Sequence, residues 1–357
     1  MANEATSDEP TRLTNTIVSL FHDQVNDFEP VSWPDGSQVR LLAGADTQDD
    51  CAIFQFSGNH ELVVGSDYVR GPKFRLYEMG YLDEYDLGYY LVSANVSDIA
   101  AMGARPIGLL SVVRYPPEMN DAVFGRVMAG IRDACTAYGC PNVGGDIGGA
   151  ERLILSASAL GVCHKDGSLL RSGAKPGDIV CLTTPTGLAG AAMAYLRSAR
   201  PSQMIDEQHL PAMLASWKRP TARVNEGLIL GASGMVTSCQ DTSDGLKATL
   251  HSIATASGAG IAIDEHALPV PDAVTAVATH LDLDELTLVM GDSVDFELAF
   301  TVAPAAASTL AELLDFHQIG LVTDEEDVVL VRKDGTRTGL PGKAWRHAPD
   351  ETGDRKA

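Results

Sequence analysis

Acidic residues occur in six short segments of this chain, five of which place them beside glycine or a small hydroxyl residue. Several of these segments follow an apolar stretch of strand length, and the ends of strands are where α/β layers open their ligand clefts. One such segment alone is typical of a turn or a helix cap, but six in one chain predict a site built from oxygen ligands. The segments are Gln48-Asp49-Asp50-Cys51, Gly65-Ser66-Asp67, Asn95-Val96-Ser97-Asp98, Gly144-Gly145-Asp146, Asp241-Thr242-Ser243-Asp244-Gly245 and Gly291-Asp292-Ser293.

The chemistry that suits such segments is the binding of Mg²⁺ and phosphate. Mg²⁺ is usually held by a few carboxylates together with the phosphates of a substrate, and adjacent glycines let backbone N–H groups approach phosphate oxygens. The sequence contains no G-x-x-x-x-G-K-[ST] motif, so no P-loop lysine neutralises a nucleotide. If a phosphate ligand binds here, metal ions must supply the positive charge.

Asp98 is the acid that packing explains least. It lies in a run from Asn95 to Ala104 whose alanines suit close helix packing. A carboxylate in such an apolar helix is costly unless it is paired or bound to a metal. We therefore expect Asp98 to be a ligand.

The elements that must position these acids alternate between strands and helices. Apolar periodicity predicts a long helix over 86–102, and the Gly/Pro-rich segment 171–178 predicts a domain boundary near residue 168. We expect domains at 36–167 and 168–347, with flexible ends at 1–35 and 348–357. Further helices are predicted at 122–138, 188–197, 221–230, 246–257 and 304–314, and strands at 40–43, 51–54, 61–64, 106–114, 153–163, 179–183, 260–263, 296–302 and 320–322.

Composition excludes several classes of protein. The chain has 357 residues, with 48 acidic and 26 basic residues and a net charge of −22, which repels nucleic acid and anionic membrane surfaces. No run of 18 apolar residues and no secretory signal is present, and the six cysteines form no C-x-x-C pair. We expect a cytoplasmic protein with reduced, buried cysteines, and no nucleic acid, membrane or zinc as its partner.

In this order the motifs resemble those of thiamine-monophosphate kinase and, more broadly, the superfamily of aminoimidazole ribonucleotide synthetase, selenophosphate synthetase and the hydrogenase maturation factor that dehydrates a carbamoyl group. The ordered set is specific although each member is not. It covers residues from about 40 to 302 and comprises 49–52, 66–67, 86–89, 95–104, 144–146, 171–178, 220–223, 241–246 and 295–302.

The resemblance implies an α/β (α+β) fold with a two-domain, synthetase-like subunit. Its N-terminal domain would form a dimeric β-barrel core, and its C-terminal domain would be α/β. It also implies a homodimer, and ATP bound in a cleft with several Mg²⁺ ions, with in-line transfer of the γ-phosphoryl group to a small-molecule acceptor. By the same resemblance the Mg²⁺ ligands are Asp50, Ser66, Asp67, Asp98, Asp146, Asp241 and Asp244, the ATP contacts are Gly145, Asp146, Arg171 and Ser243, and the catalytic set is Asp67, Asp146 and Asp244.

The departures from the family pattern fall on the acceptor side. Where the family kinases have a histidine after the Ser/Thr-Asp motif, Lys73 stands nearby, and where they have a substrate-contacting glutamate, this chain has Val294. Near the C-terminus Trp345 keeps the family's first aromatic residue, but the last aromatic is lost. The acceptor is therefore either thiamine monophosphate or a divergent small metabolite.

Two alternatives to a kinase stay open. One is ATP-dependent activation of an amide or carboxylate followed by cyclisation or dehydration, as in the sister families, which predicts free phosphate as the stable product. The other is a non-catalytic protein that keeps the fold, although an inactive homologue would not need so many acidic residues.

Overall fold

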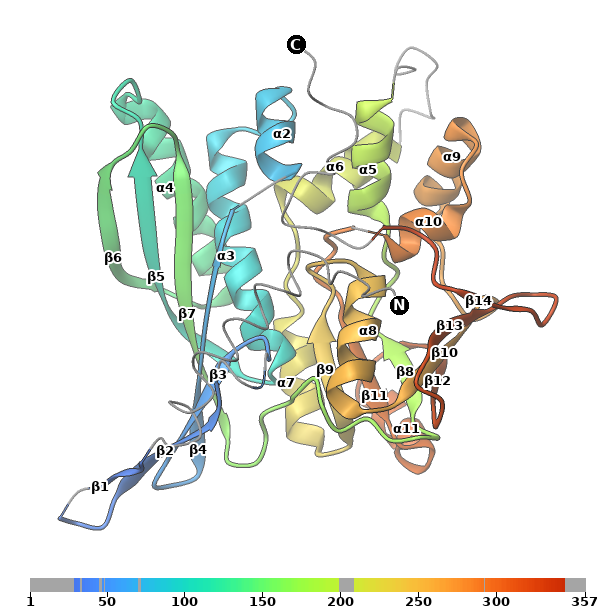
Figure 1. The fold of residues 1–357 in the computed structure, drawn as a ribbon. Helices are drawn as coiled ribbons and strands as arrows, with labels where there is room; N and C mark the ends of the chain where they lie inside the picture. The colour runs from blue at the N-terminus through green and yellow to red at the C-terminus, as the bar shows by residue number, and fades with distance from the viewer. Residues whose placement is uncertain are drawn as a thin grey trace, which may run out of the picture.

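Two seven-stranded mixed sheets form the frame of the molecule (Figure 1). The computed structural model describes residues 29–32, 34–44, 47, 49–69, 72–198, 209–291 and 293–343. The first sheet has the order β1-β2-β3-β4-β7-β5-β6, and only β5 and β6 are parallel in it. Its strands are β1 (Val31–Ser32), β2 (Gln38–Ala43), β3 (Ala52–Phe56), β4 (His60–Tyr68), β5 (Arg105–Tyr115), β6 (Asn142–Gly149) and β7 (Ile154–His164), and its helices are α2 (Pro72–Glu78), α3 (Glu84–Ala101) and α4 (Asp121–Tyr138).

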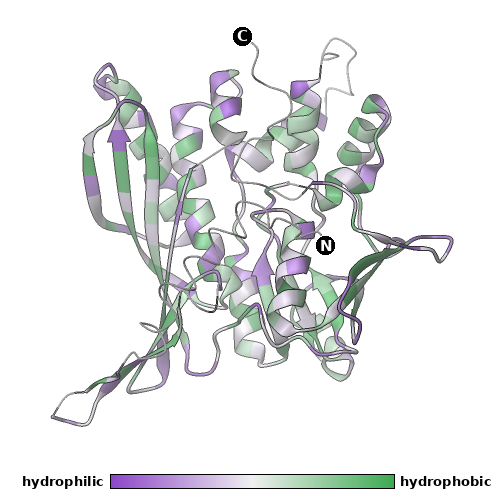
Figure 2. Ribbon diagram, viewed as in Figure 1, coloured by the Kyte–Doolittle hydropathy of each residue, from purple (hydrophilic) through white to green (hydrophobic). Residues whose placement is uncertain are grey.

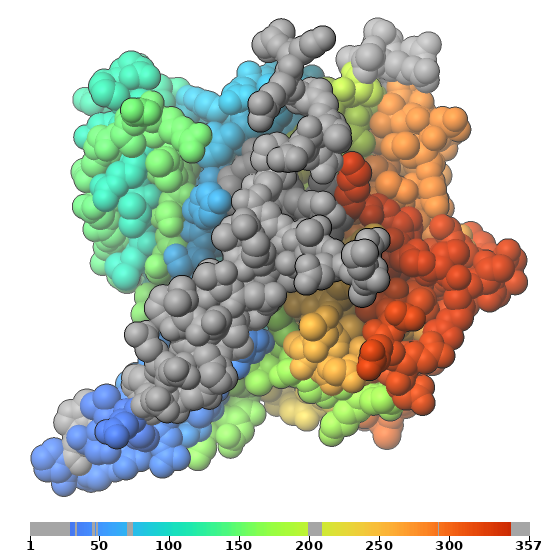
Figure 3. All heavy atoms as spheres, viewed as in Figure 1, coloured from blue at the N-terminus to red at the C-terminus, as the bar shows by residue number. Residues whose placement is uncertain are grey.

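The second sheet has the order β14-β13-β10-β12-β8-β11-β9, and β10 and β13 are its parallel pair. Its strands are β8 (Ile179–Leu182), β9 (Val236–Asp241), β10 (Gly260–Asp264), β11 (Leu298–Val302), β12 (His317–Thr323), β13 (Val328–Val331) and β14 (Arg337–Gly339). Its helices are α5 (Leu188–Arg197), α6 (His209–Lys218), α7 (Val224–Ser233), α8 (Leu246–Ser257), α9 (Asp272–Leu281), α10 (Glu285–Met290) and α11 (Pro304–Ala311). The chain thus has the two-domain α/β fold, and β1 and β2 project from its body (Figure 3).

Helix α3 is the central element. A capping box fixes its start, because the Asp83 side chain accepts a hydrogen bond from the Asp86 N–H while the Asp86 side chain accepts one from the Asp83 N–H. The helix is buried on nearly every side, since it packs against the first sheet, α4 and elements of the second domain. A polar side chain on α3 therefore points into the protein and needs a partner there.

Most of the predicted helices and strands are confirmed, with informative differences at a few ends. The helix predicted over 221–230 begins only at Val224, because the Ala222 N–H donates to the Tyr138 hydroxyl and holds the preceding segment outside the helix. The strand predicted from Phe296 begins at Leu298, because Phe296 has a φ of 54°. No strand was predicted around Gly144, yet that segment forms edge strand β6. Among the described residues, no helix is both long and apolar enough to cross a membrane.

Candidate functional site

Three of the predicted metal ligands converge between the two domains. Asp50 precedes β3, Asp98 lies on α3 and Asp241 ends β9, and each offers a carboxylate oxygen within 4.8 Å of those of the other two. The first two acids belong to the first domain and the third to the second. The geometry is that of a site for a hard cation, which oxygen ligands prefer. We call these three residues the acid cluster.

Asp50 supplies the strongest sign that the acid cluster suits a cation. Its side chain is 4% exposed, and one carboxylate oxygen forms an ion pair with the Arg171 guanidinium. The other oxygen, Oδ2, is buried and has no hydrogen-bond partner among the described residues. A buried carboxylate oxygen without a partner is costly, and a bound cation would satisfy it.

Asp241 is fully buried and is held across the domain junction. The Ser97 hydroxyl of α3 donates to its Oδ2 at 2.6 Å, and the Ser243 hydroxyl donates to its Oδ1 at 2.7 Å. Burial, followed by the charge of Asp50, raises the pKa of Asp241 to about 7, although both hydroxyl bonds oppose the rise. Asp241 is therefore poised to exchange a proton for a cation near neutral pH.

Burial also raises the pKa of Asp98, and the charges of Asp241, Asp50 and Asp67 add to the rise. Carboxylates this close cannot all ionise at low cost in a dry site. A divalent cation among them reverses that electrostatic cost, since it is the largest local charge and favours the ionised form of each ligand.

Strand β4 brings Asp67 next to α3. The Asp67 N–H donates to the Asn95 side chain of α3 at 3.0 Å. Gly65 lies on the same face of β4, where an added Cβ would be 2.6 Å from the Cys51 sulfur and 3.8 Å from the Asp98 Cβ. Ser66 faces the opposite way, and its hydroxyl donates to the Ala157 carbonyl at 2.7 Å. Asp67 thus approaches the acid cluster, whereas the Ser66 side chain does not.

The predicted ATP contacts Arg171 and Ser243 also border the acid cluster. The Arg171 N–H donates to Asp49 Oδ1 at 2.8 Å. Although burial opposes it, the charge of Asp50 and the hydrogen bond to it raise the pKa of Arg171, so the guanidinium stays charged. Asp244 lies half-buried in the turn between β9 and α8, one residue after Ser243.

Gly145 and Asp146 lie elsewhere in the fold. Asp67 pairs with Ala157 on β7, Ala157 with Ser111 on β5, and Ser111 with Gly145 on β6. Three strand spacings of about 4.8 Å place Gly145 roughly 14 Å from Asp67. Asp146, one residue further, points from the opposite face of the sheet, where it is exposed and pairs with Arg114 at 2.7 Å. Within one chain, Asp146 is not part of the acid cluster.

Of the three predicted acceptor residues, only Val294 has a side chain among the described residues. Val294 is 3% exposed and lies in the hydrophobic core rather than on an open pocket wall. Lys73 is the second residue of α2, and its side chain lies outside the described residues, as does all of Trp345.

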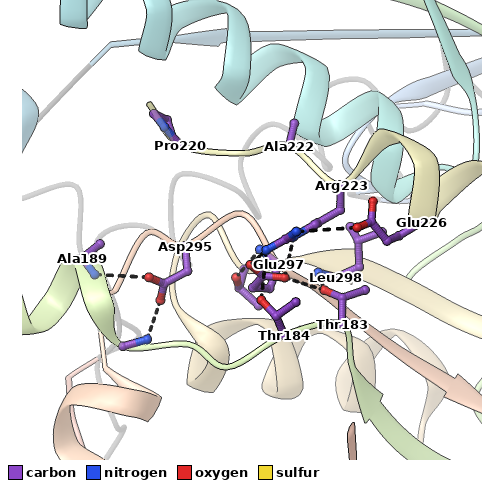
Figure 4. A network of polar contacts seen from close by, with 12 residues as sticks. Thr183, Thr184, Ala189, Pro220, Ala222, Arg223, Glu226, Asp295, Glu297 and Leu298 are labelled. Carbon is purple, nitrogen blue, oxygen red and sulfur yellow. Dashed lines mark hydrogen bonds and ion pairs between the residues drawn. The ribbon is translucent and has the colours of Figure 1, made fainter. Parts of the chain in front are cut away.

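A polar network fixes the loop that carries Val294 (Figure 4). Asp295 accepts from the Gly187 and Ala189 N–H groups at the start of α5, at 2.7 and 3.2 Å. Glu297 accepts two hydrogen bonds from Arg223, at 2.8 and 2.6 Å, and one from the Thr183 hydroxyl at 2.6 Å. Asp295 and Glu297 therefore have a structural role in this loop.

Sequence reasoning gave no individual role to three residues that position the acids, namely Asp49, Asn95 and Ser97. All three lie within two or three residues of Asp50 or Asp98 in the quoted motifs, which was the available signal. Asn95 is 1% exposed and Ser97 is fully buried, so their hydrogen bonds form in a dry environment where they are strong.

Comparisons with known proteins agree with this architecture. Two family models match the chain. The model of the "AIR synthase related protein, N-terminal domain" matches residues 48–163, and that of the "AIR synthase related protein, C-terminal domain" matches residues 175–333. A thiamine-monophosphate kinase of Pyrococcus horikoshii is 31% identical over 300 residues, which cover 84% of this chain and 90% of that protein.

Two solved structures share the fold. AaThiL complexed with AMPPCP and TMP superposes with a TM-score of 0.76 at 22% identity, covering 96% of this chain and 100% of that one. The hydrogenase maturation protein HypE of Escherichia coli gives a TM-score of 0.65 at 23% identity, covering 81% of this chain and 86% of its own. At these identities the likeness is one of fold.

Proposed function

Because the chain belongs to the thiamine-monophosphate kinase family, we propose that it transfers the γ-phosphoryl group of ATP to a small phosphate ester, with thiamine monophosphate as the first candidate. The chain is an ATP-dependent kinase, like its named relatives. The observation that carries the proposal is the acid cluster at the domain junction, where Asp50 Oδ2 is buried without a partner among the described residues. A cytoplasmic location remains a prediction.

The residues present fit Mg²⁺. We propose that Asp50, Asp98 and Asp241 hold it together with Asp67, and that Asp244 joins them from the turn after β9. When bound, Mg²⁺ would neutralise the charge of the triphosphate. Arg171 holds Asp50 in place through their ion pair, while Ser97 and Ser243 orient Asp241. If the acceptor is a phosphate ester, its attacking oxygen is already an anion and needs no general base.

We propose that the acceptor pocket differs from the family pattern at position 294. A glutamate there would attract a cationic acceptor, whereas Val294 is buried among apolar side chains. Loss of such a charged contact weakens recognition of a cation by about 1 to 3 kcal/mol. The acceptor is therefore either thiamine monophosphate bound less tightly or a phosphate ester without that positive charge.

We further propose a homodimer that forms through the first domain. We place that domain at residues 36–167, preceded by the short strand β1 (Val31–Ser32) that pairs with β2, and the second domain at 168–347. Helices α3 and α4 cover one face of the first sheet, and the ribbons of β5, β6 and β7 carry several apolar residues (Figure 2). On the opposite face Tyr68 is 45% exposed, Leu110 40% and Ile154 38%, and exposed apolar side chains that share one face are typical of a partner surface. Two such sheets packed together would make the barrel core and bring Asp146 toward the partner subunit.

The test is incubation with ATP and Mg²⁺ against thiamine monophosphate and a panel of phosphate monoesters, following ADP and the mass of the acceptor. We expect ADP together with a phosphorylated acceptor, and no product from the Asp241→Asn variant. Release of free phosphate with an acceptor that loses water instead would contradict the kinase and favour the activation chemistry of the sister families.

A further inference from the structure

A cavity lies outside the acid cluster, at the joint between the two domains. Its volume is about 530 Å³. The first domain contributes His60, Arg105 and His164, and helix α7 of the second domain contributes Leu228 and Gly231. The cavity thus combines polar side chains from one domain with a largely apolar wall from the other, which is the usual composition of a small-molecule site.

The two histidines form a cross-strand pair. His60 of β4 stands opposite His164 of β7, and their rings stack with centroids 5.1 Å apart at an angle of 27°. The Lys165 N–H donates to the Asn59 carbonyl, which makes these two residues a hydrogen-bonded pair. Because the two kinds of pair alternate along an antiparallel ladder, His60 and His164 form a non-hydrogen-bonded pair, in which side chains lie closest. Two imidazoles, each of which carries an N–H donor, therefore lie side by side at one wall.

Arg105 stands at the start of β5 on the rim of this cavity and is exposed. Within the described part of the chain its guanidinium forms no ion pair, whereas Arg114, Arg332 and Arg337 each pair with an acid. None of the described residues that line the cavity is acidic. In a chain with a net charge of −22, a concave surface with one arginine, two histidines and no acid is a local reversal of charge.

The base of the cavity is closely packed backbone. Gly103 follows α3, Gly167 lies in the connection between the domains, and Gly231 belongs to α7. A Cβ on Gly231 would lie 2.8 Å from the Gly103 carbonyl oxygen and 3.1 Å from that of Gly167. Three backbones pack here without room for a side chain, and a ligand in the cavity would touch both domains.

We propose that this cavity binds a small organic anion, a phosphate monoester with an apolar body. Arg105 supplies the planar donor fork that matches phosphate oxygens, His60 and His164 add N–H donors, and α7 packs against the apolar part. This site is separate from the acid cluster, which binds phosphate only through a cation.

That difference gives a direct test, which is titration calorimetry of the full chain with phenyl phosphate in EDTA. Without a divalent cation the acid cluster repels phosphate, so the heat reports this cavity. We expect saturable binding that weakens roughly tenfold or more in Arg105→Gln and in His164→Gln. The matched control, Lys165→Gln, removes a neighbouring exposed cation outside the cavity and should leave the affinity unchanged.

Phenol and inorganic phosphate serve as controls, because each represents one part of phenyl phosphate, the apolar ring or the anion. Each should bind at least tenfold more weakly than phenyl phosphate. No saturable heat with the wild-type chain, equal affinity for inorganic phosphate, or an unchanged affinity in Arg105→Gln would each overturn the proposal. Kinase activity is measured separately with Mg²⁺, so failure of this site and failure of the proposed function are distinguishable.

Discussion

Ser97 and Asp241 are 144 positions apart in sequence, and a hydrogen bond of 2.6 Å joins the Ser97 hydroxyl to Asp241 Oδ2. The serine lies on α3 of the first domain and the aspartate ends β9 of the second, so this bond orients a predicted metal ligand across the domain junction. It is fully buried, and a buried hydrogen bond to a charged group contributes about 1.5 to 3 kcal/mol.

Ser97→Ala should therefore raise the Mg²⁺ concentration needed for half-maximal activity by roughly tenfold or more. A Mg²⁺ titration of the initial rate measures this. Ser93→Ala is the matched control, because Ser93 lies one turn earlier on α3 and also bonds across the junction, to the Pro220 carbonyl at 3.0 Å, away from the acids. Equal Mg²⁺ dependence in the two variants would argue against a role of Ser97 in positioning Asp241.

Asp98→Asn should abolish turnover and yet stabilise the metal-free protein. The substitution removes one of several close carboxylates, whose burial and mutual repulsion raise the pKa of Asp98. Thermal unfolding in EDTA should show a higher Tm for the variant than for wild type, and added Mg²⁺ should stabilise only wild type. An active variant, or one less stable in EDTA, would contradict the metal assignment.

The stability of the metal-free protein should fall as pH rises toward neutrality. Burial, then the charge of Asp50, raises the pKa of Asp241 from 3.8 to about 7. Between these values the folded state binds a proton that the unfolded state lacks, so the free energy of unfolding decreases with pH, by up to about 1.4 kcal/mol per pH unit. Urea unfolding in EDTA at several pH values measures this, and Asp241→Asn should flatten the curve. A rise in stability over the same range would contradict the assignment.

The sequence predicts helices such as α3 and α8 well, because their apolar spacing is regular and glycines end them. The sequence also predicts that Asp50, Asp98 and Asp241 belong to one site, and the structure places these three residues together. The position of Asp146 could not be predicted, because β6 is glycine-rich, lacks apolar alternation and therefore gives no signal of which face each residue takes. The burial of Val294 could not be predicted either. It depends on the hydrogen bonds of Asp295 and Glu297 to residues far away in the sequence, which leave no local pattern.

Val294→Glu should destabilise the protein without restoring the family's acceptor contact. Val294 is 3% exposed in the apolar core, so an unpaired carboxylate there costs about 3 kcal/mol or more. Val294→Ala, which only leaves a small cavity, is the control and should cost less. Urea unfolding compares the two variants, and the KM for thiamine monophosphate shows whether the carboxylate reaches the acceptor. Tighter binding in a stable Val294→Glu variant would show that position 294 faces the pocket.

Asp146 offers a test of whether two subunits share one site. It is exposed and lies on the face of the first sheet opposite Asp67. If a dimer brings it to the partner's acid cluster, Asp146→Asn and Asp241→Asn should each be inactive alone. Mixed after dissociation and reassociation, they should form heterodimers with one intact site, about a quarter of all sites at equal amounts. The matched mixture of Asp98→Asn with Asp241→Asn should stay inactive, because both changes fall in the same cluster of one chain. If the first mixture also stays inactive, Asp146 acts within its own chain or not at all.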